Sequence, residues 1–236
     1  MIVYEKMDLA SVESAFSPVS PAFVTFCDAC HDGHAELTVL DCWSALHQSA
    51  ELGWLDFRDE PSEHSIDMDE HLHYASVANG ELHVVVPNKL LAFRSPTDLP
   101  DGRAWIDDGG TRRFSPSYYA DILSDFDVSV VLCCGVAGAD PPYDAAALEA
   151  RGVGVEVLAA DVQSGRLLAA TDRVLTLARA APGAIALHGA GGWEEGLLLS
   201  AYLIRLHGFP ARQALAWARM AHPAAQSGSG FRVAYE

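Results

Sequence analysis

Short apolar runs alternate with amphipathic stretches over the second half of the chain. Residues 128–134, 153–158 and 184–188 are rich in β-branched or small apolar side chains, which is typical of buried strands. Residues 143–150 and 166–180, which separate these runs, have apolar positions at helical spacing. Strands that alternate with helices predict an α/β fold, with a central, mostly parallel sheet flanked by helices.

The first half contains fewer regular elements. Residues 8–16 predict a short helix, and residues 36–52 predict an amphipathic helix that ends at Gly53. Residues 81–93 predict two short strands separated by a turn at Pro87 and Asn88. The fold is therefore expected to have a helical segment before its first strands.

One stretch, residues 184–200, combines a strand, a glycine-rich loop and a helix. The apolar run ends at His188, three glycines follow, and the residues from Gly196 onward are apolar at helical spacing. Such a loop favours anions, because backbone N–H groups and the helix dipole point into it. The acidic side chains of Glu194 and Glu195 oppose that preference.

Composition limits the function further. The chain has 236 residues, of which 50% are hydrophobic, and this is ample for a folded core. Its net charge of -17 opposes binding to nucleic acid or to anionic membranes, so a charge-driven partner is expected to be basic. Five cysteines, including the adjacent Cys133 and Cys134, do not suggest a secreted disulfide framework. Without a visible targeting or membrane-spanning signal, we expect a cytoplasmic protein with no membrane partner.

Two groups of cysteines raise the question of a cofactor or a reactive thiol. Soft metal ligands gather within eight residues at Cys27, Cys30, His31 and His34. The Cys-x-x-Cys-His run matches a haem attachment pattern, yet no second ligand pair follows at structural-zinc spacing, so we expect a loop with no metal or cofactor. Cys133 and Cys134 are predicted to be packed thiols, since no cationic group nearby in the sequence would lower their pKa.

Residues 183–223 carry a resemblance to a known family. The runs Ala-Ile-Ala-Leu-His, Ala-Tyr-Leu-Ile-Arg-Leu-His-Gly-Phe and Ala-Trp-Ala-Arg-Met-Ala-His-Pro resemble the catalytic core of tyrosine and dual-specificity protein phosphatases. Together with the Val-Pro-Asn-Lys turn, they are most similar to the second domain of the mitotic-exit cell-division-cycle phosphatases. The resemblance implies a dual-specificity phosphatase-like domain over residues 81–236, preceded over residues 1–80 by a remnant helix and a helical linker.

The resemblance also identifies which catalytic positions differ. The family loop is His-Cys, five residues and Arg, and here the cysteine position is Gly189 and the arginine position is Glu195. Glycine cannot form a phosphoenzyme, and a carboxylate repels phosphate where arginine would bind it. The degenerate loop consists of His188, Gly189, Ala190, Gly191, Gly192, Trp193, Glu194 and Glu195. Asp161 is left as a relic of the general acid position, and Gln226 is a poor candidate for positioning water.

These changes predict a catalytically inactive pseudophosphatase that acts as a protein-binding or scaffold subunit. Family members occur at the cytoskeleton and in cilia, so a place in such an assembly is expected by analogy. One alternative is a recognition module for basic or phosphorylated peptides. Another is an enzyme of altered acid/base chemistry that uses Asp161 with Glu194 or Glu195.

Two surfaces are candidates for binding. Asp67, Asp69 and Glu70 lie where the family lines an acidic groove that prefers basic peptides, although a solvated acidic face is also compatible with this composition. Apolar residues near the linker helix are candidates for a partner interface, namely Leu37, Leu40, Trp43, Leu46 and Trp54. The alternative is that this helix folds back and buries the same residues within its own domain.

Overall fold

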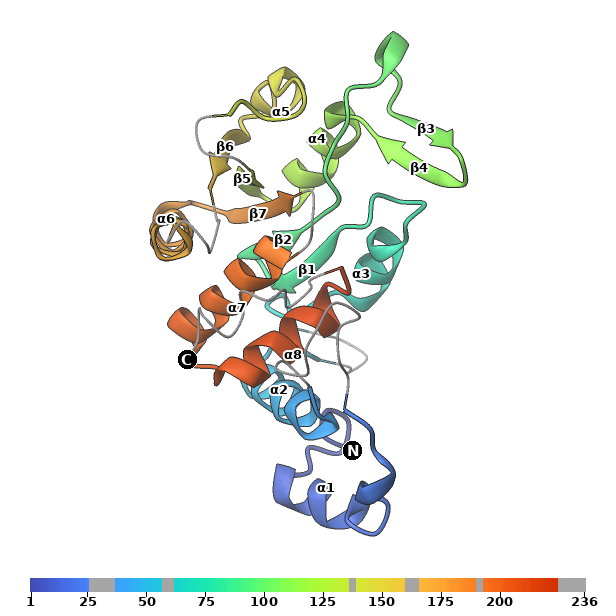
Figure 1. Ribbon diagram of the computed structural model, residues 1–236, viewed down its shortest axis with the longest axis vertical. Helices are drawn as coiled ribbons and strands as arrows, with labels where there is room; N and C mark the ends of the chain where they lie inside the picture. The colour runs from blue at the N-terminus through green and yellow to red at the C-terminus, as the bar shows by residue number, and fades with distance from the viewer. Residues whose placement is uncertain (26–36, 57–61, 136–138, 160–165, 190–192, 225–236) are drawn as a thin grey trace.

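The computed structural model describes residues 1–25, 37–56, 62–135, 139–159, 166–189 and 193–224. Within these residues a five-stranded sheet forms the centre, in the order β1-β2-β7-β5-β6 (Figure 1). Its strands are β1 (His83–Val86), β2 (Leu90–Ala92), β5 (Val128–Cys134), β6 (Gly154–Leu158) and β7 (Ala184–Gly189). β1 pairs with β2 antiparallel, whereas β2 with β7, β7 with β5, and β5 with β6 are parallel. The predicted α/β fold with a mostly parallel sheet is confirmed.

The central strand β7 places the glycine-rich loop at the carboxyl edge of the sheet. Ile185, Ala186 and Leu187 are fully buried, as expected for a parallel strand covered on both faces. At the end of β7, His188 pairs with Cys133 and Gly189 pairs with Cys134 of β5. Ligand sites in open α/β sheets form outside this edge, so the fold puts the loop in a position typical of a binding site.

Helices lie on both sides of the sheet (Figure 1). On one side lie α4 (Pro116–Asp125) and α5 (Ala146–Glu149). On the other side α6 (Leu167–Ala180), α7 (Trp193–His207) and α8 (Ala211–Ala221) pack in succession. Successive βα units on alternate faces are the arrangement expected for a doubly wound sheet.

The helix predicted over residues 143–150 is shorter than expected. α5 covers only its middle, because the carboxylate of Asp144 accepts a hydrogen bond from the backbone N–H of Ala146 at 2.9 Å and thereby forms a turn before it. Tyr143 lies outside the helix and is buried. This departure lets the tyrosine reach the end of β7.

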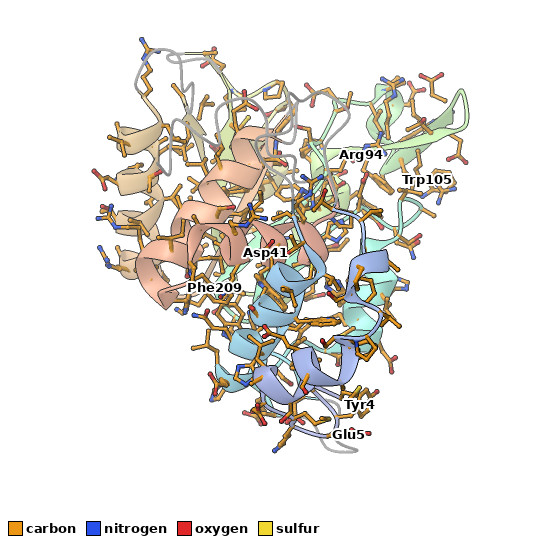
Figure 2. All side chains as sticks on the ribbon, turned by 60° about the horizontal axis from the view of Figure 1, so that its bottom comes forward. Tyr4, Glu5, Asp41, Arg94, Trp105 and Phe209 are labelled. Carbon is orange, nitrogen blue, oxygen red and sulfur yellow. The ribbon has the colours of Figure 1, made fainter. Side chains whose placement is uncertain are left out.

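A separate hairpin was not predicted from the sequence. β3 (Trp105–Asp108) and β4 (Thr111–Phe114) form a two-stranded antiparallel sheet. Gly109 and Gly110 have φ of 58° and 86°, and two consecutive positive φ angles are what a tight hairpin turn requires. The Asp-Gly-Gly sequence before β4 is the signal that would have indicated it. Figure 2 labels Trp105 on this hairpin.

The N-terminal region contains α1 (Leu9–Phe16), α2 (Val39–Glu51) and α3 (Met68–Ala75). α2 begins later than the predicted residue 36, because Thr38 caps it. The Thr38 hydroxyl accepts from the backbone N–H of Asp41, and the Asp41 carboxylate accepts from that of Thr38. Gly53 follows its C-terminus with φ of 76°, as the sequence predicts. Short 3₁₀ turns cover Ser20–Ala22 and Pro100–Gly102.

α2 packs against α8 (Figure 1). The guanidinium of Arg212 donates two hydrogen bonds to Asp41, labelled in Figure 2, at 3.1 and 2.8 Å. Ala45 of α2 is buried in the same apolar cluster as the strands of the central sheet. Residues on either side of position 80 thus share one apolar core. The boundary between a helical linker over residues 1–80 and a phosphatase-like domain over residues 81–236 stays a prediction.

Candidate functional site

The candidate site lies between the end of β7 and the first turn of α7. The predicted succession of strand, loop and helix is confirmed at both flanks, since β7 ends at Gly189 and α7 begins at Trp193. Residues 190–192, which belong to the predicted degenerate loop, lie outside the described residues. The geometry of the site is therefore built from His188, Gly189 and Glu195.

His188 is held on both ring nitrogens. Its Nδ1 lies 2.8 Å from the Ser95 hydroxyl, and its Nε2 lies 2.8 Å from the Tyr143 hydroxyl. The side chain is fully buried, and burial lowers its pKa to about 3. A neutral imidazole can donate on one nitrogen and accept on the other, so both contacts are satisfied without a charge. These contacts are those of a satisfied core histidine, and they tie β7 to two distant segments.

Glu195 is the most unusual residue of the site. Its side chain points inward and is almost fully buried, although it lies in the first turn of α7. Its Oε2 lies 3.3 Å from Nε2 of His222, which is also buried, while its Oε1 has no hydrogen-bond partner among the described residues. Burial raises the pKa of Glu195, and the hydrogen bond with His222 opposes this shift. A carboxylate in this environment cannot serve as a phosphate-binding group.

Gly189 lies against this carboxylate. A Cβ at this position would be 2.9 Å from Oε1 of Glu195 and 3.0 Å from Cβ of Cys134. The first distance is shorter than real Cβ atoms show, and the second is tighter than nine in ten real Cβ contacts. The space beside Gly189, where a nucleophilic side chain would begin, is therefore already occupied.

The thiols next to the site are packed, as predicted. Cys133 and Cys134 are buried at the end of β5. Burial raises the pKa of Cys133 to about 11, with Glu195 adding to the shift, and burial also raises the pKa of Cys134. A thiol with a raised pKa stays protonated near neutral pH and is a poor nucleophile. Neither cysteine has the lowered pKa of a nucleophilic thiolate.

Two other groups singled out in the sequence fall where the structure gives no description. Asp161, the relic acid position, lies outside the described residues, so its distance to Glu194 and Glu195 is not defined. The Cys27, Cys30, His31 and His34 cluster lies outside them too. Among the parts of the chain that the structure does describe, no three His, Cys, Asp or Glu side chains are arranged to hold a metal ion.

The acidic positions of α3 form a groove, but not one that adjoins the loop. Asp67 and Glu70 line a cavity of about 370 Å³ together with Glu63, Asp125 and Asp127. Burial raises the pKa of Glu70, and the neighbouring carboxylates of Asp67 and Asp125 add to the shift. Asp69 does not line this cavity.

The groove lies away from the strand end that carries His188 and Gly189. Asp127 immediately precedes β5 and its carbonyl accepts from the N–H of Ala184, the first residue of β7. The groove therefore lies at the amino ends of the parallel strands, opposite Gly189. Asp125 and Asp127 were missed in the sequence because they join α3 only through the folded sheet.

The apolar interface candidates divide between the core and the surface. Leu37 and Trp54 are only 5% and 6% exposed, so they are core residues and not a free binding surface. Leu46 is half-buried against the core, while Leu40 is 44% exposed. The burial of Leu37 and Trp54 favours the alternative that α2 folds back on its own domain.

Trp43 lies in a different environment, away from the central core. Its ring contacts Phe16 and Phe23 at centroid distances of 5.0 and 5.9 Å, and Phe23 is 40% exposed. These rings line a cavity of about 300 Å³ on the side of α2 that faces α1. Trp43 and Leu40 are the two interface candidates that border this cavity.

Comparison with known proteins gives relatives of one kind. No protein-family model matches the chain. Dual specificity protein phosphatase CDC14C of Homo sapiens is 27% identical over 203 residues, covering 85% of this chain and 42% of that relative. CDC14AB of Danio rerio is 29% identical over 188 residues, covering 79% and 28%, and CDC14A of Homo sapiens is 25% identical over 228 residues, covering 94% and 35%.

Solved structures of similar shape include Tk-PTP in its active form and PTPMT1. Each aligns with 65% of this chain, with a TM-score of 0.46, and the identities are 19% and 15%. The alignments cover 92% and 91% of those two chains.

These curated relatives are all CDC14-type dual specificity phosphatases, which is the kind of protein that the sequence motifs predict. The sequence is therefore CDC14-like and similar to those of dual-specificity protein phosphatases. It spans 42% and 39% of the lengths of the first two relatives that it matches. In the described part of the chain, no helix has the length and apolar character needed to span a bilayer.

Proposed function

We propose that this protein is a catalytically inactive pseudophosphatase that acts by binding other proteins. The observation that carries the proposal is the pair of exchanges at Gly189 and Glu195. A phosphatase of this family forms a covalent phosphocysteine, which requires a thiolate, and the residue at that position has no side chain. The nearest thiols, Cys133 and Cys134, are buried and have raised pKa values.

The arginine that would bind the phosphate oxygens is also absent from its expected position. Phosphoryl transfer needs cationic donors that neutralise the phosphate oxygens, and arginine supplies two parallel hydrogen bonds for this purpose. Glu195 occupies that position and turns its carboxylate inward, toward Gly189 and His222. A single negative charge 4 Å from the ionised carboxylate would be repelled by roughly 4 kcal/mol with an effective dielectric constant near 20, and a dianion by about twice as much. Neither attack on phosphorus nor firm phosphate binding is supported.

Catalytic silence is tested directly with the purified protein. Hydrolysis of para-nitrophenyl phosphate and of serine-, threonine- and tyrosine-phosphopeptides is expected to equal that of a blank without protein. Preparations from two expression hosts, each passed over two different columns, guard against contaminating phosphatases. Turnover that follows the protein peak through both purifications would contradict the proposal.

A scaffold role predicts a stable protein partner. By analogy with the family, we propose a cytoplasmic place in a cytoskeletal or ciliary assembly, and the net charge of -17 favours a basic partner. Affinity purification of the endogenous protein, followed by mass spectrometry, tests this proposal. Recovery of the protein as a free monomer in several cell types, with no reproducible partner, would count against it.

A second candidate function is the reversible binding of basic peptides, and the cavity beside α3 favours it. Five carboxylates line that cavity, with no lysine or arginine among its lining residues. Charge attraction between exposed groups weakens as salt is added, because the Debye length falls to about 10 Å at 0.1 M. Binding of a lysine- and arginine-rich peptide should therefore decrease steeply between low and high salt.

The variant Asp67→Asn with Glu70→Gln tests this groove by titration calorimetry. It should weaken peptide binding several-fold, while Asn at position 67 can still cap α3. Asp69→Asn is the matched control, since Asp69 lies on the same helix but does not line the cavity. Equal loss in both variants would indicate general charge attraction and exclude the groove as a specific site.

A further inference from the structure

The carboxylate of Glu195 lies where a catalytic side chain would lie. Its Oε1 would be 2.9 Å from a Cβ at position 189 and has no hydrogen-bond partner among the described residues. The side chain of Glu195 is 4% exposed, so this oxygen is turned into the protein instead of toward solvent. Burying a carboxyl oxygen without a hydrogen-bond partner costs free energy of folding, so this placement of Glu195 is unusual.

His222 holds the carboxylate from the other side. Its Nε2 lies 3.3 Å from Glu195 Oε2, and its side chain is 3% exposed. The ring of His83 lies 4.8 Å from that of His222, and the ring of His71 lies 6.0 Å from that of His83. Glu81, Glu194 and the two cysteines of β5 are the other titratable groups near the pair. Among the described residues, His222 is the one that contacts the Glu195 carboxyl group by a hydrogen bond.

From this geometry we infer that Gly189, Glu195 and His222 form one structural unit, in which the Glu195 carboxyl group is a built-in occupant of the space beside Gly189. The inference deepens the proposed function and rests on it, because it states what fills the site that phosphate would enter. The Glu195 side chain takes the space beside position 189, so glycine is required there to make room for it as well as being a lost nucleophile.

Two physical effects support the internal occupant. The N-terminus of a helix favours negative charge, and Glu195 supplies a carboxylate in the first turn of the 15-residue helix α7. A side chain at position 189 would meet both Glu195 and Cβ of Cys134, and the latter cannot rotate away. The closed arrangement thus needs glycine at position 189, an acid at position 195 and a hydrogen-bond partner at position 222.

A double-mutant cycle tests the unit through thermal unfolding followed by circular dichroism. Gly189→Ala should lower the unfolding temperature by several degrees in the wild type. In the Glu195→Ala background the same change should cost less, because only the contact with Cys134 remains. In the Glu195→Gln background, where the side-chain volume is kept, the cost should persist.

Gly154→Ala is the matched control. Its Cβ would lie 3.8 Å from the nearest atom outside its neighbours, which is an ordinary contact. It should therefore leave the unfolding temperature nearly unchanged in each background. An equal cost of Gly189→Ala with Glu or Ala at position 195, or a cost no greater than that of Gly154→Ala, would overturn the inference.

A second measurement does not depend on whether every variant folds well. The imidazole ¹⁵N resonances of His222 should shift in Glu195→Gln, because its hydrogen-bond partner changes from a carboxyl group to an amide. Those of His188 should not shift, because its partners are Ser95 and Tyr143. Unchanged His222 resonances would show that the pair does not exist in solution. Phosphatase assays of the wild type do not depend on these stability and NMR measurements. A wrong assignment of the Gly189, Glu195 and His222 unit can therefore be distinguished from a wrong pseudophosphatase proposal.

Discussion

At the scale of single residues, the exchange at position 189 cannot be understood without the exchange at position 195. The 2.9 Å between the glutamate oxygen and a Cβ at Gly189 means that any larger residue there displaces the Glu195 side chain. A displaced Glu195 side chain loses its hydrogen bond with His222, and a buried polar group without a partner is costly. Placing a cysteine at position 189 while Glu195 is kept therefore creates a steric clash between the two side chains.

This reasoning leads to a prediction about repair. Gly189→Cys should stay inactive, since its thiol would face Glu195, and a neighbouring carboxylate raises a thiol pKa. The pair Gly189→Cys with Glu195→Arg removes both the clash and the negative charge, so it has the better chance of measurable turnover. Initial rates with an aryl phosphate decide between them. Full activity from the single change would show that Glu195 does not block the loop.

At the scale of elements, α2 packs against the core of the domain through one face and against α1 through another. Leu46 packs against the core, and Gln48 donates through Nε2 to the carbonyl of His207 at 3.0 Å. Trp43 instead contacts the aromatic rings of Phe16 and Phe23. The two positions, proposed together as an interface, should behave differently when they are changed.

Leu46→Ser should destabilise the protein by about 1–3 kcal/mol, because it removes apolar area that packs against the core. Trp43→Ser should cost less and should release a bound partner if the aromatic cavity is an interface. Urea unfolding measures the first effect, and co-purification measures the second. Leu40→Ser, at a position already 44% exposed, serves as the control for stability. Equal destabilisation by Trp43→Ser and Leu46→Ser would make Trp43 a core residue and end the interface proposal.

At the scale of the whole molecule, two buried histidines link stability to pH. Burial lowers the pKa of His188 to about 3. Burial, with the nearby His222 and His71, lowers the pKa of His83 to about 3. Both start from an ordinary value of 6.5, so below that pH the unfolded chain binds protons that the folded chain refuses. The folded state is therefore destabilised by acid, whereas the raised pKa of Glu195 acts in the opposite direction.

The free energy of unfolding should fall as pH decreases from about 6.5 toward 3, by up to about 1.4 kcal/mol per pH unit for each histidine. Urea unfolding at a series of pH values measures this slope. His83→Gln should flatten it, because the variant has no group to protonate at this position. His64→Gln, at an exposed site, should not change it. The same slope in all three proteins would contradict the assignment.

The sequence by itself determined the elements whose pattern is local. β-Branched runs, helical spacing and the glycine at the end of α2 depend on neighbours within a few residues, so they predicted most of the strands and helices. The Asp-Gly-Gly turn of the missed hairpin was a local signal of the same kind. The two exchanges of the loop came from the resemblance to the phosphatase motif.

Only the tertiary structure decided which distant residues meet. His188 contacts Ser95 and Tyr143 at separations of 93 and 45 residues, and Glu195 contacts His222 at 27 residues. Such contacts depend on the order and register of the strands and on the packing of α8 against its neighbours, which no local spacing encodes. The same physical reason explains why Leu37 and Trp54 became core residues, and why the internal partner of Glu195 could not be found from the chain alone.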